Sequence, residues 1–253
     1  MTLEPLRNDL IPFLNPYLPR LETDSTRKQP FITLTYAQSL DSRISKGKGL
    51  RTTISHPETK TMTHYLRYHH DAILIGCGTA LADDPGLNCK YAPDGQVLSA
   101  ANSPRPVILD PHVKWKFKGS KMEQIFMSSG GKPPIVIVNR LPEPKDQEKH
   151  VTYLPMDVSP TSGKYGWKMI FEKLYMQFNL KSIMVEGGAV VINDLLATNT
   201  LVDSLIITIG AKYLGSQGVE ASPWCGELAL QDISWWKGTC DVVLCARPPS
   251  TAD

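Results

Sequence analysis

The sequence predicts an α/β protein, in which a mostly parallel, twisted central sheet is covered by helices on both faces. Segments with strand-like and helix-like patterns alternate along residues 30–247 without an internal repeat. Such alternation is typical of parallel strands joined by helices. A chain of 253 residues, 42% of them hydrophobic, also has enough apolar surface for a substantial core. Because no linker interrupts residues 30–247, we expect one domain there, with an arm at 1–29 and a tail at 248–253.

The first half of the chain begins with the proline-broken arm, which ends in polar residues and therefore indicates an extended segment that either packs on the body or stays free of it. Apolar and small polar residues alternate over 31–39 and predict a strand. Ser55 and Glu58 have the spacing of a capping box, and they predict a helix that runs to about His69. A strand at 71–76 follows and leads into a turn that contains two glycines.

The second half of the chain continues this alternation after a polar loop. The predicted strands lie at 106–110, 135–139, 182–186, 201–209 and 241–246, and the predicted helices at 166–178 and 189–197. The run from Lys114 to Lys121 is interpreted as a solvated face. The last two strands are apolar enough to build the core or to supply a subunit interface, and the sequence leaves both open.

Composition excludes several classes of protein. The formal charge of +2, from 27 basic and 25 acidic residues, gives no reason to expect nucleic acid or a membrane surface as a partner, although Lys46, Lys48 and Arg51 could meet a small phosphate. The N-terminus carries acidic residues and prolines where a secretory signal needs an apolar run. No stretch approaches the roughly 20 apolar residues of a membrane span. We therefore expect a reducing cytosolic or nuclear compartment.

The cysteines point to free, buried thiols rather than to a metal site. Their number is odd, they form no CxxC pair, and they lie in no Cys/His cluster with metal-ligand spacing; they are Cys77, Cys89, Cys225, Cys240 and Cys245. The sequence also lacks the P-loop, GxSxG and HExxH motifs and the zinc-deaminase signature. We expect no metal.

The segment AILIGCGTALADDPGL at 72–87 is the first candidate ligand-binding motif. Gly76 and Gly78 let the backbone approach a bulky anion such as a pyrophosphate, and Thr79 offers a hydroxyl. Two carboxylates, Asp83 and Asp84, follow. The alternative is a strand that ends in a tight turn and a short helix with no ligand, and a lone G-x-G does not decide between them.

The segment VEGGAVVIND provides a second strand-to-helix turn of the same design. The strand ends in Glu186, and Gly187 and Gly188 lead directly into a helix whose first N–H groups can hold a phosphate. Two such turns in one sheet favour a single elongated dinucleotide, although these glycines also serve a simple tight turn. Neither turn is a Rossmann fingerprint, because Leu81 replaces the third glycine of the first.

Three segments resemble the RibD-type reductase domains of the riboflavin pathway, and in particular their stand-alone fungal and archaeal members. The segments are TYAQSLDSRIS at 35–45, LRYHHDAILIGCGTALADDPGL at 66–87 and IMVEGGAVVINDLL at 183–196. They occur in the family's order and span most of residues 30–247. The resemblance implies a dihydrofolate-reductase-like fold, NADPH as hydride donor, a ribosylaminopyrimidine 5′-phosphate as substrate, and a homodimer.

The resemblance also implies which residues bind each ligand. On the cofactor side these are Gln38, Thr53, Gly76, Gly78, Thr79, Asp83, Gly187, Gly188, Ala189, Val190 and Val191; on the substrate side they are Arg67, Leu87, Lys90 and Glu186. Lys90 stands where many members have arginine, which keeps the charge but loses a bidentate fork. Ser42 replaces a common glycine. Structural alternatives remain: Arg67 as a helix C-terminal cap, Asp83 and Asp84 as N-terminal caps, and Gln38 as an ordinary strand residue.

The resemblance further implies reduction of an imine that forms when the ribosylamine ring opens. Our hypothesis is that Glu186 or Asp83 organises the ring-opened substrate, with the proton arriving through water. Because the deaminase motif is missing, the expected substrate is the 2,5-diamino compound. The alternatives are the deaminated uracil analogue and a catalytically silent nucleotide-binding relative. The basic residue that contacts the cofactor 2′-phosphate is not identified by the sequence.

Overall fold

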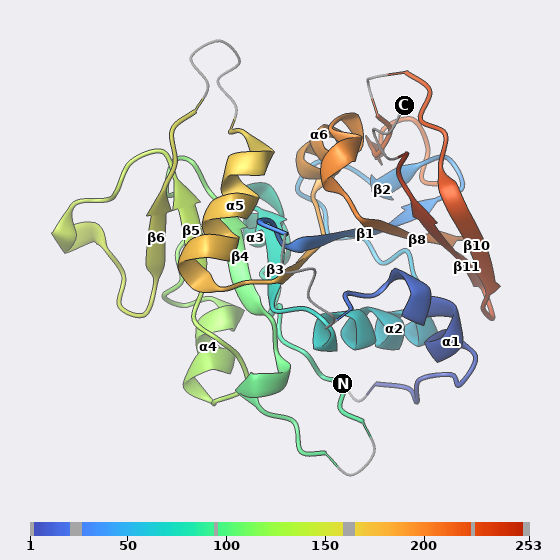
Figure 1. Ribbon diagram of the computed structural model, residues 1–253, viewed down its shortest axis with the longest axis horizontal. Helices are drawn as coiled ribbons and strands as arrows, with labels where there is room; N and C mark the ends of the chain where they lie inside the picture. The colour runs from blue at the N-terminus through green and yellow to red at the C-terminus, as the bar shows by residue number, and fades with distance from the viewer. Residues whose placement is uncertain (1–2, 21–26, 94–95, 159–164, 224–225, 250–253) are drawn as a thin grey trace.

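The central element of the computed structural model is a nine-stranded sheet with the order β10-β11-β8-β1-β7-β3-β4-β5-β6 (Figure 1). The structure describes residues 3–20, 27–93, 96–158, 165–223 and 226–249. The strands are β1 (Phe31–Ser39), β3 (Ala72–Gly76), β4 (Arg105–Leu109), β5 (Ile135–Val138), β6 (Thr152–Pro155), β7 (Ser182–Val185), β8 (Ser204–Gly210), β10 (Gln231–Lys237) and β11 (Asp241–Arg247). From β8 to β6 all neighbours pair in parallel, and β11 and β10 add two antiparallel pairings. The predicted mostly parallel sheet is confirmed.

Helices cover both faces of the sheet, as predicted. Figure 1 shows α5 (Trp167–Phe178) and α6 (Ala189–Ala197) on one side, and α1 (Leu10–Leu14), α2 (Pro57–Tyr68) and α4 (Lys121–Met127) on the other. Each strand contributes side chains to the core on both faces of the sheet, because successive side chains of a strand point to opposite faces. Within β3, Leu74 packs in the core cluster under α5 and α6, whereas Ile73 and Ile75 pack in the cluster that contains residues of α3 (Cys77–Asp83) and α4.

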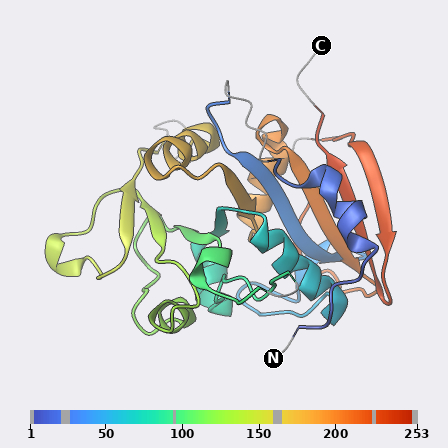
Figure 2. The same ribbon diagram turned by 60° about the horizontal axis from the view of Figure 1, so that its bottom comes forward.

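The N-terminal segment packs against the sheet instead of extending away from it. Leu10, Leu14 and Tyr17 are buried in a cluster with residues of α2, β8 and β11. Figure 2 shows α1 beside the C-terminal strands. The sequence predicted an extended arm and left open whether it packs on the body; it does pack there, but Leu10–Leu14 forms one short helix, which a 3₁₀ turn, η1 (Asn15–Tyr17), continues. Residues 21–26 of the predicted arm and 250–253 of the predicted tail lie outside the described residues.

The start of α2 differs from the predicted capping box. His56, not Ser55, is the N-cap: its ring Nδ1 accepts the backbone N–H of Glu58 at 3.4 Å, and Pro57 occupies the first helical position. The Glu58 carboxylate accepts the backbone N–H and the hydroxyl of Thr239, and its Oε1 lies 3.7 Å from the ring Nδ1 of His56. The prediction of the helix was correct, and its capping chemistry was wrong.

Several elements were not predicted. They are β6, β10 and α4, the small sheet of β2 (Arg43–Ser45) and β9 (Val219–Glu220), and the 3₁₀ turns η2 (Ala100–Asn102), η3 (Pro144–Asp146) and η4 (Asn199–Leu201). The run Lys114–Lys121 is only in part a solvated face. Its lysines alternate with Trp115 and Phe117, and both aromatic rings are buried in the core cluster under α4.

The last two predicted strands contribute to the core. Every residue of β8 except Ile209 is buried, and β11 lies between β8 and β10 inside the sheet. Of the predicted buried thiols, Cys89 and Cys245 are buried, Cys77 is half-buried and Cys240 is exposed. Cys225 lies outside the described residues.

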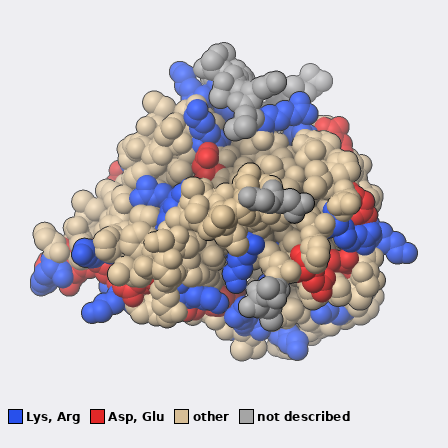
Figure 3. Space-filling view, turned by 90° about the horizontal axis from the view of Figure 1, so that it is seen from below, with Lys and Arg blue, Asp and Glu red and all other residues tan. Residues whose placement is uncertain are grey.

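The surface carries both signs of charge. On the face seen from below the sheet, Asp and Glu side chains lie among the Lys and Arg side chains (Figure 3). Among the described helices, none has both the length and the apolar character to cross a membrane.

Candidate active site

A cavity of about 820 Å³ lies at the carboxyl ends of the central strands β1, β7 and β3. Its walls come from β1, from the loop between β2 and α2, from α3, and from the turn that leads into α6. The lining residues that the sequence singled out are Lys48, Arg51, Thr53, Gly76, Gly78, Thr79, Asp83, Glu186, Gly188, Ala189, Val190 and Val191. In parallel sheets this edge is the usual ligand-binding edge.

The two glycine turns are in direct contact, because β3 and β7 are neighbouring parallel strands. The backbone N–H of Gly76 donates to the carbonyl of Gly187 at 2.8 Å. A Cβ atom on Gly188 would lie 2.9 Å from the Thr79 hydroxyl, which is closer than real Cβ atoms approach. Gly187 has a φ of 98°, a conformation that favours glycine. The two sequence motifs therefore form one continuous surface of the cavity.

Each glycine turn ends in the N-terminus of a helix. Gly76 is the N-cap of α3 and Gly188 is the N-cap of α6, and neither cap is closed by a side-chain hydrogen bond. The first turns of both helices also lack acidic residues. The helix dipole at Ala189 and Val190 is therefore not neutralised from within the helix, and α6 offers its first N–H groups to an anion.

The two adjacent carboxylates of the first motif have different positions. Asp83 ends α3 and lines the cavity. Burial raises the pKa of the Asp83 carboxyl, and the nearby charge of Arg51 partly opposes that shift. Asp84 turns away and accepts the backbone N–H of Lys121 at 3.0 Å, at the start of α4. Asp84 therefore caps the N-terminus of α4, as the alternative interpretation of this motif predicted, whereas Asp83 remains available to a ligand.

Glu186 lines the cavity and forms an ion pair with Arg67. Arg67 Nε donates to Glu186 Oε1 at 3.0 Å, and an Nη atom donates to Oε2 at 2.8 Å. The other Nη donates to the carbonyl of Asn88 at 3.1 Å. These three acceptors lie outside α2, so the guanidinium does not cap its own helix. Arg67 is not among the residues that line the cavity.

Five predicted site residues do not line the cavity: Arg67, Gly187, Gln38, Leu87 and Lys90. Gln38 lies on β1 in register with Ile209 of β8. Leu87 is 1% exposed and belongs to the core cluster of α3 and α4. Lys90 is exposed, and its backbone N–H donates to His64 Nδ1 at 3.1 Å.

Other lining residues were missed by the sequence argument. Tyr36 and Thr208 contribute from β1 and β8, and Lys60 from α2. The alternation of β1 showed which residues share a face, but not which face a ligand meets. Two cations of the noted basic cluster, Lys48 and Arg51, do reach the cavity.

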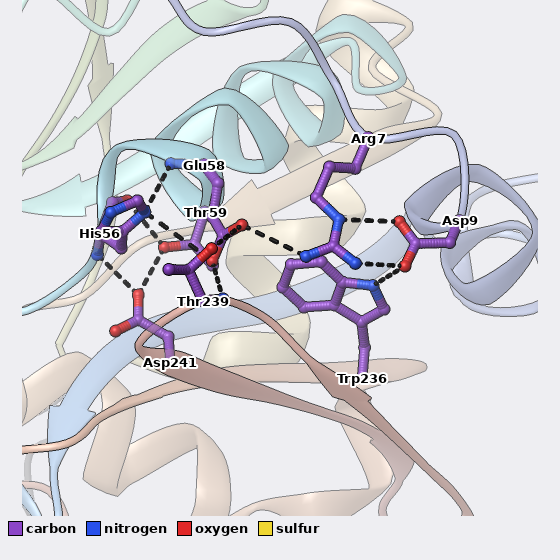
Figure 4. Close-up of polar contacts among 8 residues, drawn as sticks. All are labelled: Arg7, Asp9, His56, Glu58, Thr59, Trp236, Thr239 and Asp241. Atoms are coloured by element: carbon purple, nitrogen blue, oxygen red, sulfur yellow. Dashed lines mark hydrogen bonds and ion pairs between the residues drawn. The ribbon is translucent and has the colours of Figure 1, made fainter.

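The cavity wall at residues 51–55 is fixed at its end by buried polar contacts (Figure 4). Asp241, the first residue of β11, is 4% exposed. Its Oδ2 accepts the backbone N–H of His56 at 2.6 Å and the hydroxyl of Thr59 at 2.8 Å. These bonds join the start of α2, directly after the cavity wall, to the β10–β11 hairpin.

The same network reaches the N-terminal segment (Figure 4). Arg7 donates to Asp9 at 2.7 and 3.1 Å and to Glu58 at 3.4 Å, and its guanidinium lies 4.7 Å from the centre of the Trp236 ring. The Trp236 indole donates to Asp9 at 3.0 Å. Through the contact of Arg7 with Glu58, the segment before α1 is joined to the start of α2, which follows the cavity wall at residues 51–55.

Comparison with known proteins identifies the family. The model of the RibD C-terminal domain matches residues 30–244. The chain belongs to the RibD C-terminal domain family. A 2,5-diamino-6-ribosylamino-4(3H)-pyrimidinone 5′-phosphate reductase of Saccharomyces cerevisiae is 57% identical over 98% of both chains. The corresponding reductase of Debaryomyces hansenii is 47% identical over 98% of this chain and 99% of its own.

Solved structures agree with this assignment. A riboflavin biosynthesis reductase of Saccharomyces cerevisiae superposes with a TM-score of 0.84 at 52% identity, covering 96% of this chain and all of the other. RibD of Acinetobacter baumannii shares the fold, with a TM-score of 0.72 at 20% identity over 89% of this chain and 60% of its own. This RibD C-terminal domain protein is an oxidoreductase. Within its described residues, no group of three or more His, Cys, Asp or Glu is placed to hold a metal ion.

Proposed function

We propose that this chain reduces 2,5-diamino-6-ribosylamino-4(3H)-pyrimidinone 5′-phosphate with NADPH, and so converts the ribosyl side chain to a ribityl chain in riboflavin biosynthesis. Relatives named for this substrate match the chain over nearly their full length. The observation that carries the proposal is the contact between the two glycine turns at the cavity, which gives one surface for an elongated dinucleotide.

The residues at the cavity suit such a cofactor. Its volume of about 820 Å³ lies within the usual range of small-molecule sites. The uncapped N-terminus of α6 can bind a phosphate through its backbone N–H groups. Gly188 leaves room beside Thr79 for close approach, and Lys48 and Arg51 supply positive charge from the opposite loop. When bound, the nicotinamide supplies the hydride for C1′ of the substrate.

Residues of the chain then orient the substrate and direct a proton to its nitrogen. Reduction of an imine needs one proton at nitrogen besides the hydride at carbon. Among the described residues, Glu186 and Asp83 are the acidic ones that line the cavity. We assign to them the positioning of the ring-opened sugar, with water carrying the proton. The raised pKa of Asp83 favours its protonated form more than in an ordinary aspartate.

Most of the other site residues keep the roles that the family resemblance implies. We propose that Thr53, Gly76, Gly78, Gly187 and the first turn of α6 contact the cofactor. Lys90 would contact the substrate phosphate. Partial loss of solvation, followed by the charges of Lys121, Lys60 and Arg67, lowers the pKa of Lys90. Gln38 and Leu87, which do not line the cavity, would act through the shape of β1 and of the loop before Lys90.

The direct test combines purified protein and NADPH with each of two pyrimidines, the 2,5-diamino compound and its deaminated uracil analogue. We expect the NADPH absorbance to fall with the diamino compound, at a higher kcat/KM than with the analogue or with NADH. Preference for the uracil would reassign the substrate. Oxidation with neither would favour a silent nucleotide-binding relative. Glu186→Gln should lower turnover, and an unchanged kcat and KM would refute its proposed role.

We also propose a cytoplasmic homodimer. The edge strand β10 exposes Ile233 and Trp235, at 52% and 61%, and these side chains could pair with a second copy. Light scattering after size exclusion would give the mass of the assembly. A monomer at micromolar concentration would contradict the dimer without affecting the proposed reaction.

A further inference from the structure

The hydroxyl of Tyr36 is a polar group at the cavity for which the fold provides no partner. Tyr36 lies on β1, lines the cavity and is half-buried. None of the described residues forms a hydrogen bond with its hydroxyl. The fully enclosed polar atoms without a partner in the described part of the chain are Arg43 Nε, Asn193 Oδ1 and Ser204 Oγ. The Tyr36 hydroxyl is not one of them, so it is open to the cavity space.

Other tyrosines with little exposure have hydroxyls that are paired inside the protein. Tyr17 donates to the Ser234 hydroxyl at 2.9 Å, and Tyr165 donates to the side chain of Asn139. A tyrosine hydroxyl that leaves water normally finds such a partner, because desolvation without a hydrogen bond costs free energy. Burial raises the pKa of Tyr36 far above its usual range, so the hydroxyl stays neutral and keeps its proton. Its O–H group therefore suits an acceptor that arrives with a ligand.

Tyr36 lies on the face of β1 that α6 covers. It packs against the core cluster that contains Val191 and Ile192 of α6, and these two residues also line the cavity. Its partner in the β1–β8 register is Ile207, which belongs to the same cluster. Helix α2 covers the opposite face of the sheet (Figure 1). The Tyr36 hydroxyl therefore belongs to the half of the cavity that the second glycine turn and α6 form.

The register of β1 and β7 brings Tyr36 to this glycine turn. The pairing ends with Leu34 opposite Val185, and two residues further along each strand are Tyr36 and Gly187. A dinucleotide with its phosphates at the start of α6 extends in two directions from the turn. The half with the reacting ring has to approach Glu186, the acidic residue directly before Gly187, because the substrate is assigned to that part of the cavity. Tyr36 thus lies on the nicotinamide side of the turn.

We propose that the Tyr36 hydroxyl donates a hydrogen bond to an acceptor oxygen in the nicotinamide half of bound NADPH, and so helps to orient the ring. This role rests on the proposed function, because it needs NADPH in the cavity. It adds a cofactor-binding residue that the two glycine motifs do not contain. Since the bond does not exist in the unliganded protein, its loss should be visible only when the cofactor binds.

Tyr36→Phe isolates this bond, because it removes the hydroxyl and keeps the packed ring. In isothermal titration calorimetry, the Kd for NADPH should rise about 3- to 10-fold, which is the contribution of one neutral hydrogen bond. The thermal midpoint of the unliganded protein should not fall, since no hydrogen bond within the protein is lost. In steady-state kinetics, the KM for the pyrimidine should stay unchanged.

Tyr17→Phe is the matched control. Tyr17 is 4% exposed, does not line the cavity, and its hydroxyl is paired with that of Ser234. Its replacement should lower the thermal midpoint of the unliganded protein and leave the Kd for NADPH unchanged. The two tyrosine variants should therefore show opposite patterns of stability and cofactor affinity.

A shortened ligand locates the contact along the cofactor. Adenosine 2′,5′-bisphosphate has the adenosine end of NADPH and lacks the nicotinamide half. Tyr36→Phe and the wild type should bind this probe with the same Kd, although they differ in their Kd for NADPH. An equal loss of affinity for both ligands would place the hydroxyl at the adenosine end and refute the assignment to the nicotinamide half.

The outcomes distinguish this role from the proposed function. A wild-type chain that binds no NADPH refutes both. A wild type that binds NADPH and reduces neither pyrimidine refutes the proposed reaction alone, and the two Kd values still decide the role of Tyr36. An unchanged Kd for NADPH in Tyr36→Phe, a loss confined to the KM for the pyrimidine, or a fall in thermal midpoint equal to that of Tyr17→Phe refutes the role of Tyr36 alone.

Discussion

Replacing Asp241 by alanine is expected to destabilise the fold and to loosen one wall of the cavity. The carboxylate is 4% exposed, and its Oδ2 accepts two hydrogen bonds, from the His56 backbone at 2.6 Å and from the Thr59 hydroxyl at 2.8 Å. A hydrogen bond to a charged group contributes about 1.5–3 kcal/mol to stability. Alanine removes both charge-assisted bonds and leaves the partly buried His56 N–H without its acceptor, whereas the Thr59 hydroxyl keeps the His56 carbonyl at 2.9 Å, so we expect a loss of about 3–5 kcal/mol in the free energy of unfolding.

Urea and thermal unfolding measure this loss. For a chain of this length, about 3–5 kcal/mol corresponds to a decrease of roughly 6–20 °C in Tm. Asp241→Asn keeps a neutral acceptor and should cost only about 1–2 kcal/mol, since charge-assisted bonds are about twice as strong as neutral ones. The matched control is Asp146→Ala on η3, an exposed aspartate whose replacement should change stability by less than about 0.5 kcal/mol.

The same variant tests the link between the network and the cavity. Residues 51–55 line the cavity immediately before His56, so Asp241→Ala should also weaken NADPH binding at temperatures where the protein remains folded. A Thr59→Val change made in the Asp241→Ala background should cost less than it does alone. A loss of stability no larger than that of Asp146→Ala would refute the reasoning, as would full additivity with Thr59→Val.

Three further changes test the close approach at Gly188, the lowered pKa values of two buried histidines, and the packing of the core. Gly188→Ala should raise the Kd for NADPH at least 10-fold in a fluorescence titration, because its Cβ would lie 2.9 Å from the Thr79 hydroxyl; unchanged affinity would contradict the placement of the cofactor there. Burial lowers the pKa of His64 to about 3 and of His70 to about 4, so below pH 6.5 the unfolded chain binds protons that the native chain does not. Stability should therefore fall as pH decreases from 6.5 towards 4, by up to about 1.4 kcal/mol per pH unit for each histidine, and His70→Gln should reduce the slope of unfolding free energy against pH. Phe171, on the buried face of α5, does not line the cavity, so Phe171→Ala should lower the free energy of unfolding in urea by about 3–5 kcal/mol without a direct effect on the cavity. A loss below about 1 kcal/mol would place the ring outside the main core.

The sequence was most informative where a local pattern and the tertiary environment agree. The alternation over β1 predicted its bounds, Phe31–Ser39, because this central strand packs on both faces. The helix at Ala189–Ala197 was predicted to the residue, since Gly188 ends the turn and the apolar run starts at once. For α4 a signal existed and was missed: Ser120 and Glu123 have capping spacing, and Ser120 Oγ accepts the Glu123 N–H at 3.2 Å.

The remaining elements depend on contacts that local patterns do not contain. In β10, Trp235 is 61% exposed and Trp236 is 6% exposed, because the strand lies at the sheet edge with only one face covered. The pair of Arg67 and Glu186 joins residues 119 positions apart, and only the topology brings them together. Residue types could indicate that Arg67 is important, but not that its guanidinium faces a carboxylate.

The position of β7 in the sheet has a consequence for how the protein is made. β7 lies between β1 and β3, yet more than a hundred residues of chain separate β3 from Ser182, where β7 begins. A nascent chain that has not yet extended past Val185 holds β1 and the group β3 to β6 with no strand to join them, and β8, β10 and β11 have not yet been made. The cavity cannot close before this strand enters, so cofactor cannot assist the early stages of folding. Such long-range pairing is slow and leaves sheet edges open to aggregation. A chain divided between α5 and β7 is therefore expected to yield fragments that fold only when both are present.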